Sequence, residues 1–288
     1  MELADLRRAV EAGLDALLPP AHERPRRLHA AMRYAVLEGG GKRLRPLLML
    51  AAAHAVGGAW EPLVPAAAGV ECIHAYSLVH DDLPALDDDD LRRGRPSLHR
   101  AFDEATALLA GDALLPLGFG SLAQVAVVPE RCRLALAILA AATGSTALVG
   151  GQAEDLMAEG QPPSLERVEW IHARKTSALI EAALEMGAVL VGAEARQRAA
   201  LRRFGRAYGL AFQILDDLLD LTGGAGKEAG GDHARGKQTY PAVLGREGAV
   251  AAGRAAIDEA RAALVELGGD TRLLEALVRE GPLRSDLF

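Results

Sequence analysis

Apolar residues recur at helical spacing along almost the whole chain, and glycine or proline interrupts each run. Leu28, Met32 and Val36 form one such stripe, which glycines 39–41 end. Alanine and leucine are abundant and aromatic residues make up only 4%, which favours helices over a β sandwich. No alternating run is long enough to predict a sheet, so the sequence predicts an all-α fold. The same pattern predicts further helices at 47–56, 65–81, 103–128, 133–149, 165–191 and 194–221.

The chain of 288 residues contains no internal repeat, low-complexity linker or shift in composition. A length of this order is compatible with two domains or with one large helical domain. Without a linker, residues 1–288 are predicted to form a single domain. Half of the residues are hydrophobic, which excludes an intrinsically disordered chain.

Charge and cysteine content exclude several classes of function. The net charge of −7 provides no overall basic footprint for a nucleic acid. Cys72 and Cys132 stand alone in apolar surroundings, without the spacing of a zinc site. The N-terminal residues lack the apolar core of a signal peptide, and the uncharged stretch 134–153 is broken by glycine, serine and threonine. We therefore expect this stretch to be a buried core segment of a cytoplasmic protein without membrane insertion.

Two aspartate clusters stand out. Asp216 and Asp220 are four residues apart on one helical face, where like charges repel unless a cation neutralises them. Mg²⁺ suits such carboxylates, because it takes oxygen ligands and keeps positions for substrate phosphates. The alternative for each cluster is a solvated acidic turn or helix face. The first cluster consists of Asp81, Asp82, Asp87, Asp88, Asp89 and Asp90, and Pro84 within it requires the chain to fold back for Asp87 to join Asp81.

Cations accompany the aspartates. Arginine offers a bidentate fork to phosphate and lysine a point charge, so paired acids with paired cations predict a diphosphate site. For the cations at 42–45, the alternative is that they form only the basic start of a helix. The glycine-rich segment 222–240 is predicted to be a mobile polar loop, and its resemblance to a P-loop fails because Gln238 follows Lys237. The cations are Lys42, Arg43, Arg45, Arg92, Arg93, Lys175, Lys227 and Lys237.

Six ordered motifs resemble the trans-isoprenyl diphosphate synthases, and within them the bacterial farnesyl diphosphate synthases. They are GGGKRLRP, ECIHAYSLVHDDLPALDDDDLRRGRPSLH, GGQAEDL, HARKTSAL, FQILDDLLD and GKEAGGDHARGKQTYP, and they extend from about Arg24 to Gly245. The resemblance implies an all-α isoprenoid synthase fold around a deep central cavity, and a homodimer. It also implies condensation of isopentenyl diphosphate with dimethylallyl or geranyl diphosphate, giving (2E,6E)-farnesyl diphosphate.

The resemblance also implies roles for individual residues. Three Mg²⁺ ions are expected between Asp81, Asp82 and Asp87 on one side and Asp216 and Asp220 on the other. An allylic diphosphate is expected at these ions with Arg92, Lys175, Lys227 and Lys237, and isopentenyl diphosphate at Lys42, Arg45, His74 and Arg93. Thr176 and Gln213 are expected to stabilise a carbocation, Asp217 to take part in catalysis, and Gln152 and Asp155 to support the polar wall of the cavity.

Product length is expected to depend on two residues before the first aspartate motif. Tyr76 lies five residues before Asp81 on one predicted helix, about 7.5 Å deeper along its axis, and is expected to form the cavity floor. The alternative is that its ring only packs in the core. Ser77 is small and leaves the path above open. Ser177, Gly231 and the non-basic C-terminus depart from the family pattern. The alternatives are a geranylgeranyl or geranyl diphosphate synthase, a class I terpene cyclase and a non-catalytic subunit.

Overall fold

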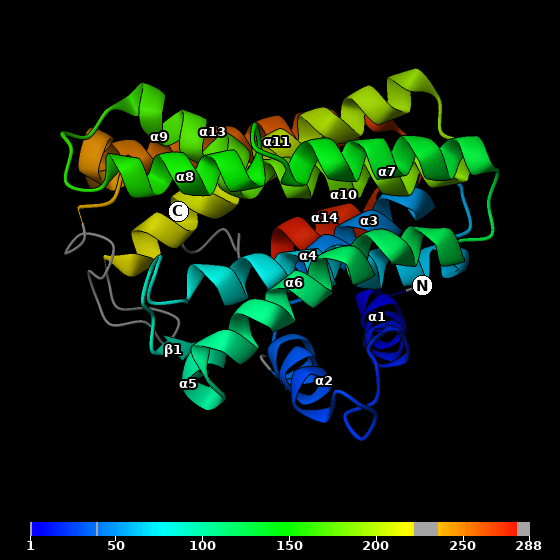
Figure 1. Cartoon of the computed structure of the whole chain (residues 1–288). Coiled ribbons are helices and arrows are strands. Elements are labelled where there is room, and N and C mark those ends of the chain that lie inside the picture. The colour runs from blue at the N-terminus through cyan, green and yellow to red at the C-terminus, as the bar shows by residue number, and fades with distance from the viewer. Residues whose placement is uncertain (1, 39, 222–235, 281–288) are drawn as a thin grey trace.

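The computed structural model describes residues 2–38, 40–221 and 236–280 and confirms the all-α prediction. Figure 1 shows two layers of long helices, with α7–α11 and α13 in the upper layer and α1, α2, α4 and α6 in the lower one. The helices are α1 (Leu3–Leu17), α2 (Arg26–Arg33), α3 (Leu44–Ala55), α4 (Val64–Asp81), α5 (Leu98–Ala101), α6 (Glu104–Gly120), α7 (Pro129–Thr143), α8 (Leu148–Ala158), α9 (Leu165–His172), α10 (Ala178–Val191), α11 (Ala195–Asp220), α13 (Tyr240–Leu267) and α14 (Arg272–Glu280).

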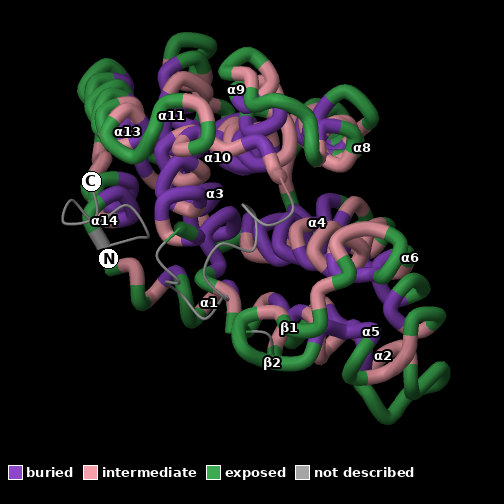
Figure 2. The backbone as a smooth tube through the Cα atoms, turned by 90° about the vertical axis from the view of Figure 1, so that its left-hand side faces the viewer, coloured by how far each residue is buried: buried purple, intermediate pink, exposed green. Residues whose placement is uncertain are grey.

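Helices α3 and α10 form the centre of the bundle. Helix α10 packs on α3, α7 and α11, and α3 also packs on α4, so these two helices join the layers. Every residue of α3 except His54 is buried, as its nearly uniform apolar sequence requires (Figure 2). The close approach depends on Gly187, since a Cβ there would lie 2.1 Å from the carbonyl oxygen of Met49.

Two short features interrupt the regular helices. A hairpin pairs β1 (Leu91–Arg92) with β2 (Arg95–Pro96), although the sequence pattern predicted no strand. Its turn residues Arg93 and Gly94 both have positive φ, the conformation of a tight two-residue turn that suits glycine. Single π-helical turns also occur, at Tyr34–Glu38 after α2 and at Ala173–Ser177 between α9 and α10.

The predicted helix 133–149 and the buried-core prediction for residues 134–153 were each wrong in part. Helix α7 ends at Thr143 and α8 begins at Leu148, because Gly144 breaks the run. Leu134, Leu136 and Val149 are exposed rather than buried. Within the described residues, Glu61–Asp81, Glu104–Gln124 and Pro129–Ala158 have the length and hydropathy to cross a membrane.

Candidate active site

The first aspartate motif folds back on the end of α4, as Pro84 predicted. Helix α4 ends at Asp81, and the backbone N–H of Asp87 then donates to the carbonyl oxygen of Asp81 at 2.8 Å. The N–H of Asp88 donates to Leu83 at 3.2 Å. These two bonds close a compact turn, which brings Asp87 back to Asp81.

Asp81 is a carboxylate whose surroundings disfavour its ionised form. Burial raises its pKa to about 6, and although the Lys175 ammonium lowers that pKa, the nearby Asp87 raises it again. Lys175 donates to Asp155 at 2.7 Å. Burial alone would lower the pKa of Lys175, but Asp155 and Asp81 outweigh it and the pKa is raised. Lys175 is therefore charged, and its charge acts on the Asp81 carboxylate.

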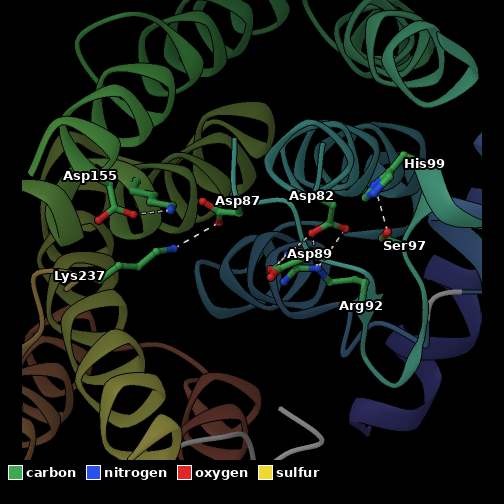
Figure 3. Close-up of polar contacts among 9 residues, drawn as sticks. Asp82, Asp87, Asp89, Arg92, Ser97, His99, Asp155 and Lys237 are labelled. Atoms are coloured by element: carbon green, nitrogen blue, oxygen red, sulfur yellow. Dashed lines mark hydrogen bonds and ion pairs between the residues drawn. The ribbon is translucent and has the colours of Figure 1, made fainter. Parts of the chain in front are cut away.

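Asp87 of the first aspartate motif points towards Lys237, which lies three residues before α13 (Figure 3). Lys237 Nζ donates to Asp87 Oδ2 at 3.3 Å, although the two residues are 150 positions apart. The second oxygen, Asp87 Oδ1, is buried and has no hydrogen-bond partner. This carboxylate therefore keeps one oxygen for a further cation.

Asp82 points away from Asp87 and towards the hairpin, where Arg92 lies (Figure 3). Arg92 Nε lies 3.0 and 3.3 Å from the two oxygens of Asp82, and Arg92 Nη2 donates to Oδ1 as well. Burial raises the pKa of Asp82, although Arg92 lowers it. The arginine thus occupies both oxygens of a predicted metal ligand, so Asp82 connects the metal motif to the hairpin in this structure.

The second aspartate motif ends α11, and its middle residue has a structural role. Asp217 Oδ2 accepts from the backbone N–H of Tyr240 at 2.9 Å and so holds the first residue of α13. Asp217 Oδ1 accepts from Gln213 Nε2 at 3.1 Å. Asp217 and Asp220 are buried, whereas Asp216 is partly exposed. Asp217, for which a part in catalysis was predicted, therefore also anchors α13 to α11.

Lys175 and Thr176 lie on the π-helical turn between α9 and α10, a type of turn frequent at functional sites. The turn packs directly on α8 at Gly151. A Cβ at this position would lie only 2.4 Å from the backbone nitrogen of Lys175. The Thr176 hydroxyl donates to Gln213 Oε1 at 2.7 Å, which leaves its own lone pairs available. In α8, both amide atoms of Gln152 are buried without partners.

A cationic cluster lies about two turns before Asp81 along α4, at the start of α3 and beside the hairpin. Burial lowers the pKa of His74 well below its ordinary value, and the charges of Arg45 and Arg93 lower it further. Burial also lowers the pKa of Arg45 to about 10. Lys42 is exposed, whereas Arg43 is buried and paired with carboxylates. The structure thus brings the predicted Arg45, His74 and Arg93 together and leaves Lys42 at the edge.

Comparisons with known proteins agree with this geometry. The family model described as polyprenyl synthetase matches residues 25–264. The chain belongs to the polyprenyl synthetase family. It is 49% identical to the farnesyl diphosphate synthase of Escherichia coli K12 over 85% of each chain, and 46% identical to geranylgeranyl pyrophosphate synthase 11 of Arabidopsis thaliana over 83% of this chain and 69% of that one. Its fold matches the apo crystal structure of an FPP/GFPP synthase from Zymomonas mobilis with a TM-score of 0.87, 37% identity and 97% coverage of both chains.

In this polyprenyl synthetase, Tyr76 and Ser77 lie on one continuous helix with Asp81, as predicted. The buried Tyr76 ring packs edge to face on His80, with ring centroids 5.7 Å apart. His80 contacts α6, through the carbonyl oxygen of Leu108 at 3.0 Å. Burial raises the pKa of Tyr76 and the Asp81 charge adds to this, so the phenol lies within the field of that carboxylate.

The residues present suit Mg²⁺, although no three acidic, histidine or cysteine side chains within residues 2–38, 40–221 and 236–280 form a ready-made metal site. The unpartnered Asp87 oxygen and the raised pKa of Asp81 are both features that a divalent cation would relieve. Lys227 and Gly231 lie outside the described residues. Ser177 is buried against Gly209 of α11. A Cβ on Gly209 would lie 2.5 Å from the Ser177 hydroxyl oxygen.

Two acidic residues that contact the cationic cluster were not predicted from the sequence. Glu71 lies one turn before His74 and is buried among arginines, and Glu11 of α1 contacts Arg43. A glutamate within an otherwise apolar stretch at the helical spacing of His74 is the one signal that points to Glu71.

Proposed function

We propose that this enzyme condenses isopentenyl diphosphate with dimethylallyl and then geranyl diphosphate to give (2E,6E)-farnesyl diphosphate. The observation that supports this best is the division of α4. Asp81 at its end belongs to a carboxylate group suited to Mg²⁺, whereas His74, two turns earlier, belongs to a cluster of arginines. One helix therefore borders two different anion sites, and a reaction between two diphosphates needs both.

The residues suggest how the reaction is divided. Bound Mg²⁺, of which three ions are proposed, would neutralise the departing allylic diphosphate. Asp81, Asp87, Asp216 and Asp220 would hold the ions, with Asp82 positioned by Arg92. Lys175 and Lys237 add fixed positive charge beside Asp81 and Asp87, and Lys227 completes the proposed set.

The chain's own dipoles suit a cationic intermediate. The Thr176 hydroxyl donates to Gln213, so its lone pairs are free to face an allylic carbocation. The isopentenyl double bond attacks this cation, a carbon–carbon bond forms, and a proton leaves to the departing diphosphate. Apolar walls exclude water, which would otherwise capture the cation.

The product is tested by incubating the pure protein with Mg²⁺, isopentenyl diphosphate and dimethylallyl diphosphate, followed by chromatography of the dephosphorylated products. We expect mainly a fifteen-carbon alcohol. A main product of ten, twenty or more carbons would reject the farnesyl assignment and favour a geranyl or geranylgeranyl diphosphate synthase, while leaving the reaction class intact. No transfer at all would favour a non-catalytic subunit, and hydrocarbon release from farnesyl diphosphate alone would favour a cyclase.

We also propose that the protein is a cytoplasmic homodimer. Large apolar side chains are exposed along α6, α7 and α8, which lie at the front of Figure 1. Leu109 is 55% exposed and Met157 72% exposed, and such a surface is typical of a protein interface. Sedimentation of the wild type should give a dimer mass, and Leu109→Glu should shift it towards the monomer. A monomeric wild type, or flotation with lipid vesicles, would contradict this arrangement.

A further inference from the structure

Glu71 is a buried acid within the cationic cluster. Glu71 is only 4% exposed, and it lies on α4 one turn before His74. Arg43 at the start of α3 donates to it from Nη1 at 3.2 Å. Its charge also acts on Arg45 and Arg93, raising the pKa of each guanidinium against the lowering effect of burial. One carboxylate therefore serves three arginines from two segments of the chain.

The hydrogen bonds divide these arginines into two kinds. Arg43 has two acidic partners, because its Nε and Nη2 lie 2.8 and 3.3 Å from the carboxylate of Glu11. Arg45 differs, since its Nε is buried without a hydrogen-bond partner. Glu71 Oε2 is likewise buried and without a partner. The cluster thus contains an N–H donor, Arg45 Nε, that does not bind the Glu71 carboxylate.

The backbone is shaped to keep these groups together. A Cβ on Gly41 would lie 2.7 Å from Nη1 of both Arg43 and Arg93, and 3.1 Å from Glu71 Oε1. Any side chain at this position would push the guanidiniums apart. The glycine is therefore part of the cluster's geometry as well as a stop for the preceding helix.

The three arginines and the two glutamates leave an excess of positive charge in a buried place. Without Glu71 the guanidiniums would repel one another more strongly, and burial of unpaired charge is costly. An arriving anion would meet the same arginines, but it would also meet the negative charge of Glu71.

We propose that Glu71 is an internal counter-ion that holds the arginines in position while the site is empty and competes with the diphosphate that binds there. Glu71 is thus a positioning residue that limits the affinity of the cluster and so favours release of the molecule whose diphosphate group is bound there. This inference rests on the proposed function only for the identity of the anion, the diphosphate of isopentenyl diphosphate.

The test uses Glu71→Gln, which keeps the shape of the side chain and an oxygen for Arg43 but removes the charge. Binding of inorganic pyrophosphate is measured by calorimetry in EDTA, so that no metal-dependent site contributes. We expect the melting temperature of the free variant to fall and its pyrophosphate affinity to rise about tenfold, equivalent to about 1.4 kcal/mol. In steady-state assays with Mg²⁺, KM for isopentenyl diphosphate should fall while KM for the allylic substrate stays unchanged.

Glu11→Gln is the matched control, because Glu11 contacts the same arginine from the exposed side. It should lower the melting temperature without tightening pyrophosphate binding. Glu71→Asp retains the charge and should keep the wild-type affinity. If Glu71→Gln unfolds on its own, pyrophosphate should restore its folding, and failure to do so would overturn the proposal.

The same measurements test the second diphosphate site and the role of Glu71 separately. A wild type that does not bind pyrophosphate without metal would remove the second diphosphate site and the inference with it. A wild type that binds, with a Glu71→Gln variant whose affinity is unchanged or weaker, would leave the proposed function standing and overturn the counter-ion role alone.

Discussion

Replacing Asp81 by asparagine should make the free protein more stable at neutral pH, although it removes a proposed metal ligand. Burial and neighbouring aspartates raise the pKa of Asp81 to about 6 in the folded chain, from an ordinary value of 3.8. The folded state therefore binds this proton more tightly than the unfolded state does. Ionisation of Asp81 consequently lowers the free energy of unfolding, and the loss develops as the pH rises from about 4 to about 6.

The size of the effect follows from the shift. A difference of about two pKa units corresponds to about 3 kcal/mol once the carboxyl is ionised, and to roughly half of that at pH 5. Asparagine carries no charge at either pH, so Asp81→Asn should gain about 2–3 kcal/mol at pH 7.5, less at pH 5 and nothing below about pH 4.

Urea unfolding of the metal-free protein at pH 7.5 and pH 5 measures these free energies. Asp88→Asn is the control, because Asp88 lies in the same turn, is exposed, and has a positive φ that asparagine tolerates. Mg²⁺ with pyrophosphate should stabilise the wild type more than Asp81→Asn. A variant that is less stable than the wild type at pH 7.5, or a gain that is equal at both pH values, would refute the reasoning.

Three further predictions concern activity and product. Asp216→Ala should reduce turnover by roughly 10²–10³-fold or more while the circular dichroism spectrum is kept, because one charge-stabilising group is worth about that much; near-normal turnover would remove Asp216 from the metal site. Tyr76→Ala should shift the products to twenty carbons or more and Ser77→Phe to ten, as chromatography would reveal; an unchanged profile in both would exclude this part of α4 from length control. Gly151→Ala should lower both kcat and the melting temperature, because the new Cβ would lie 2.4 Å from the backbone nitrogen of Lys175 and displace the π-helical turn. A wild-type kcat would contradict the view that this close packing positions Lys175.

Helix positions could be predicted because burial imposes a period of 3.6 residues on the sequence, and α4 and α11 are where the pattern placed them. The π-helical turn that carries Lys175 could not, since it changes the hydrogen-bond partner without changing the residues that favour a helix. The break in 134–153 was visible as Gly144, but apolar residues on an exposed face look the same in sequence as those in a core.

The candidate site shows the same limit at the level of single side chains. The order of charged residues predicted which of them would gather, but their partners depend on distances of a few ångströms. Asp82 and Asp217 are chemically the same as their neighbours in sequence, yet one is held by Arg92 and the other by the N–H of Tyr240. Arg43 and Arg45 are two residues apart, and only the first is paired with acids.

The two sides of α4, one facing the pocket and one packed on α6, have a consequence for how such enzymes diverge. Glu71, His74 and Asp82 line a pocket beside the hairpin, whereas Ile73 and His80 pack on α6 and Tyr76 packs edge to face on His80. Because these sets share no residue, mutations can accumulate in one without disturbing the other. With Tyr76 in its proposed role as cavity floor, a lineage could change product size while keeping its diphosphate chemistry, and the two sides of one helix would evolve independently.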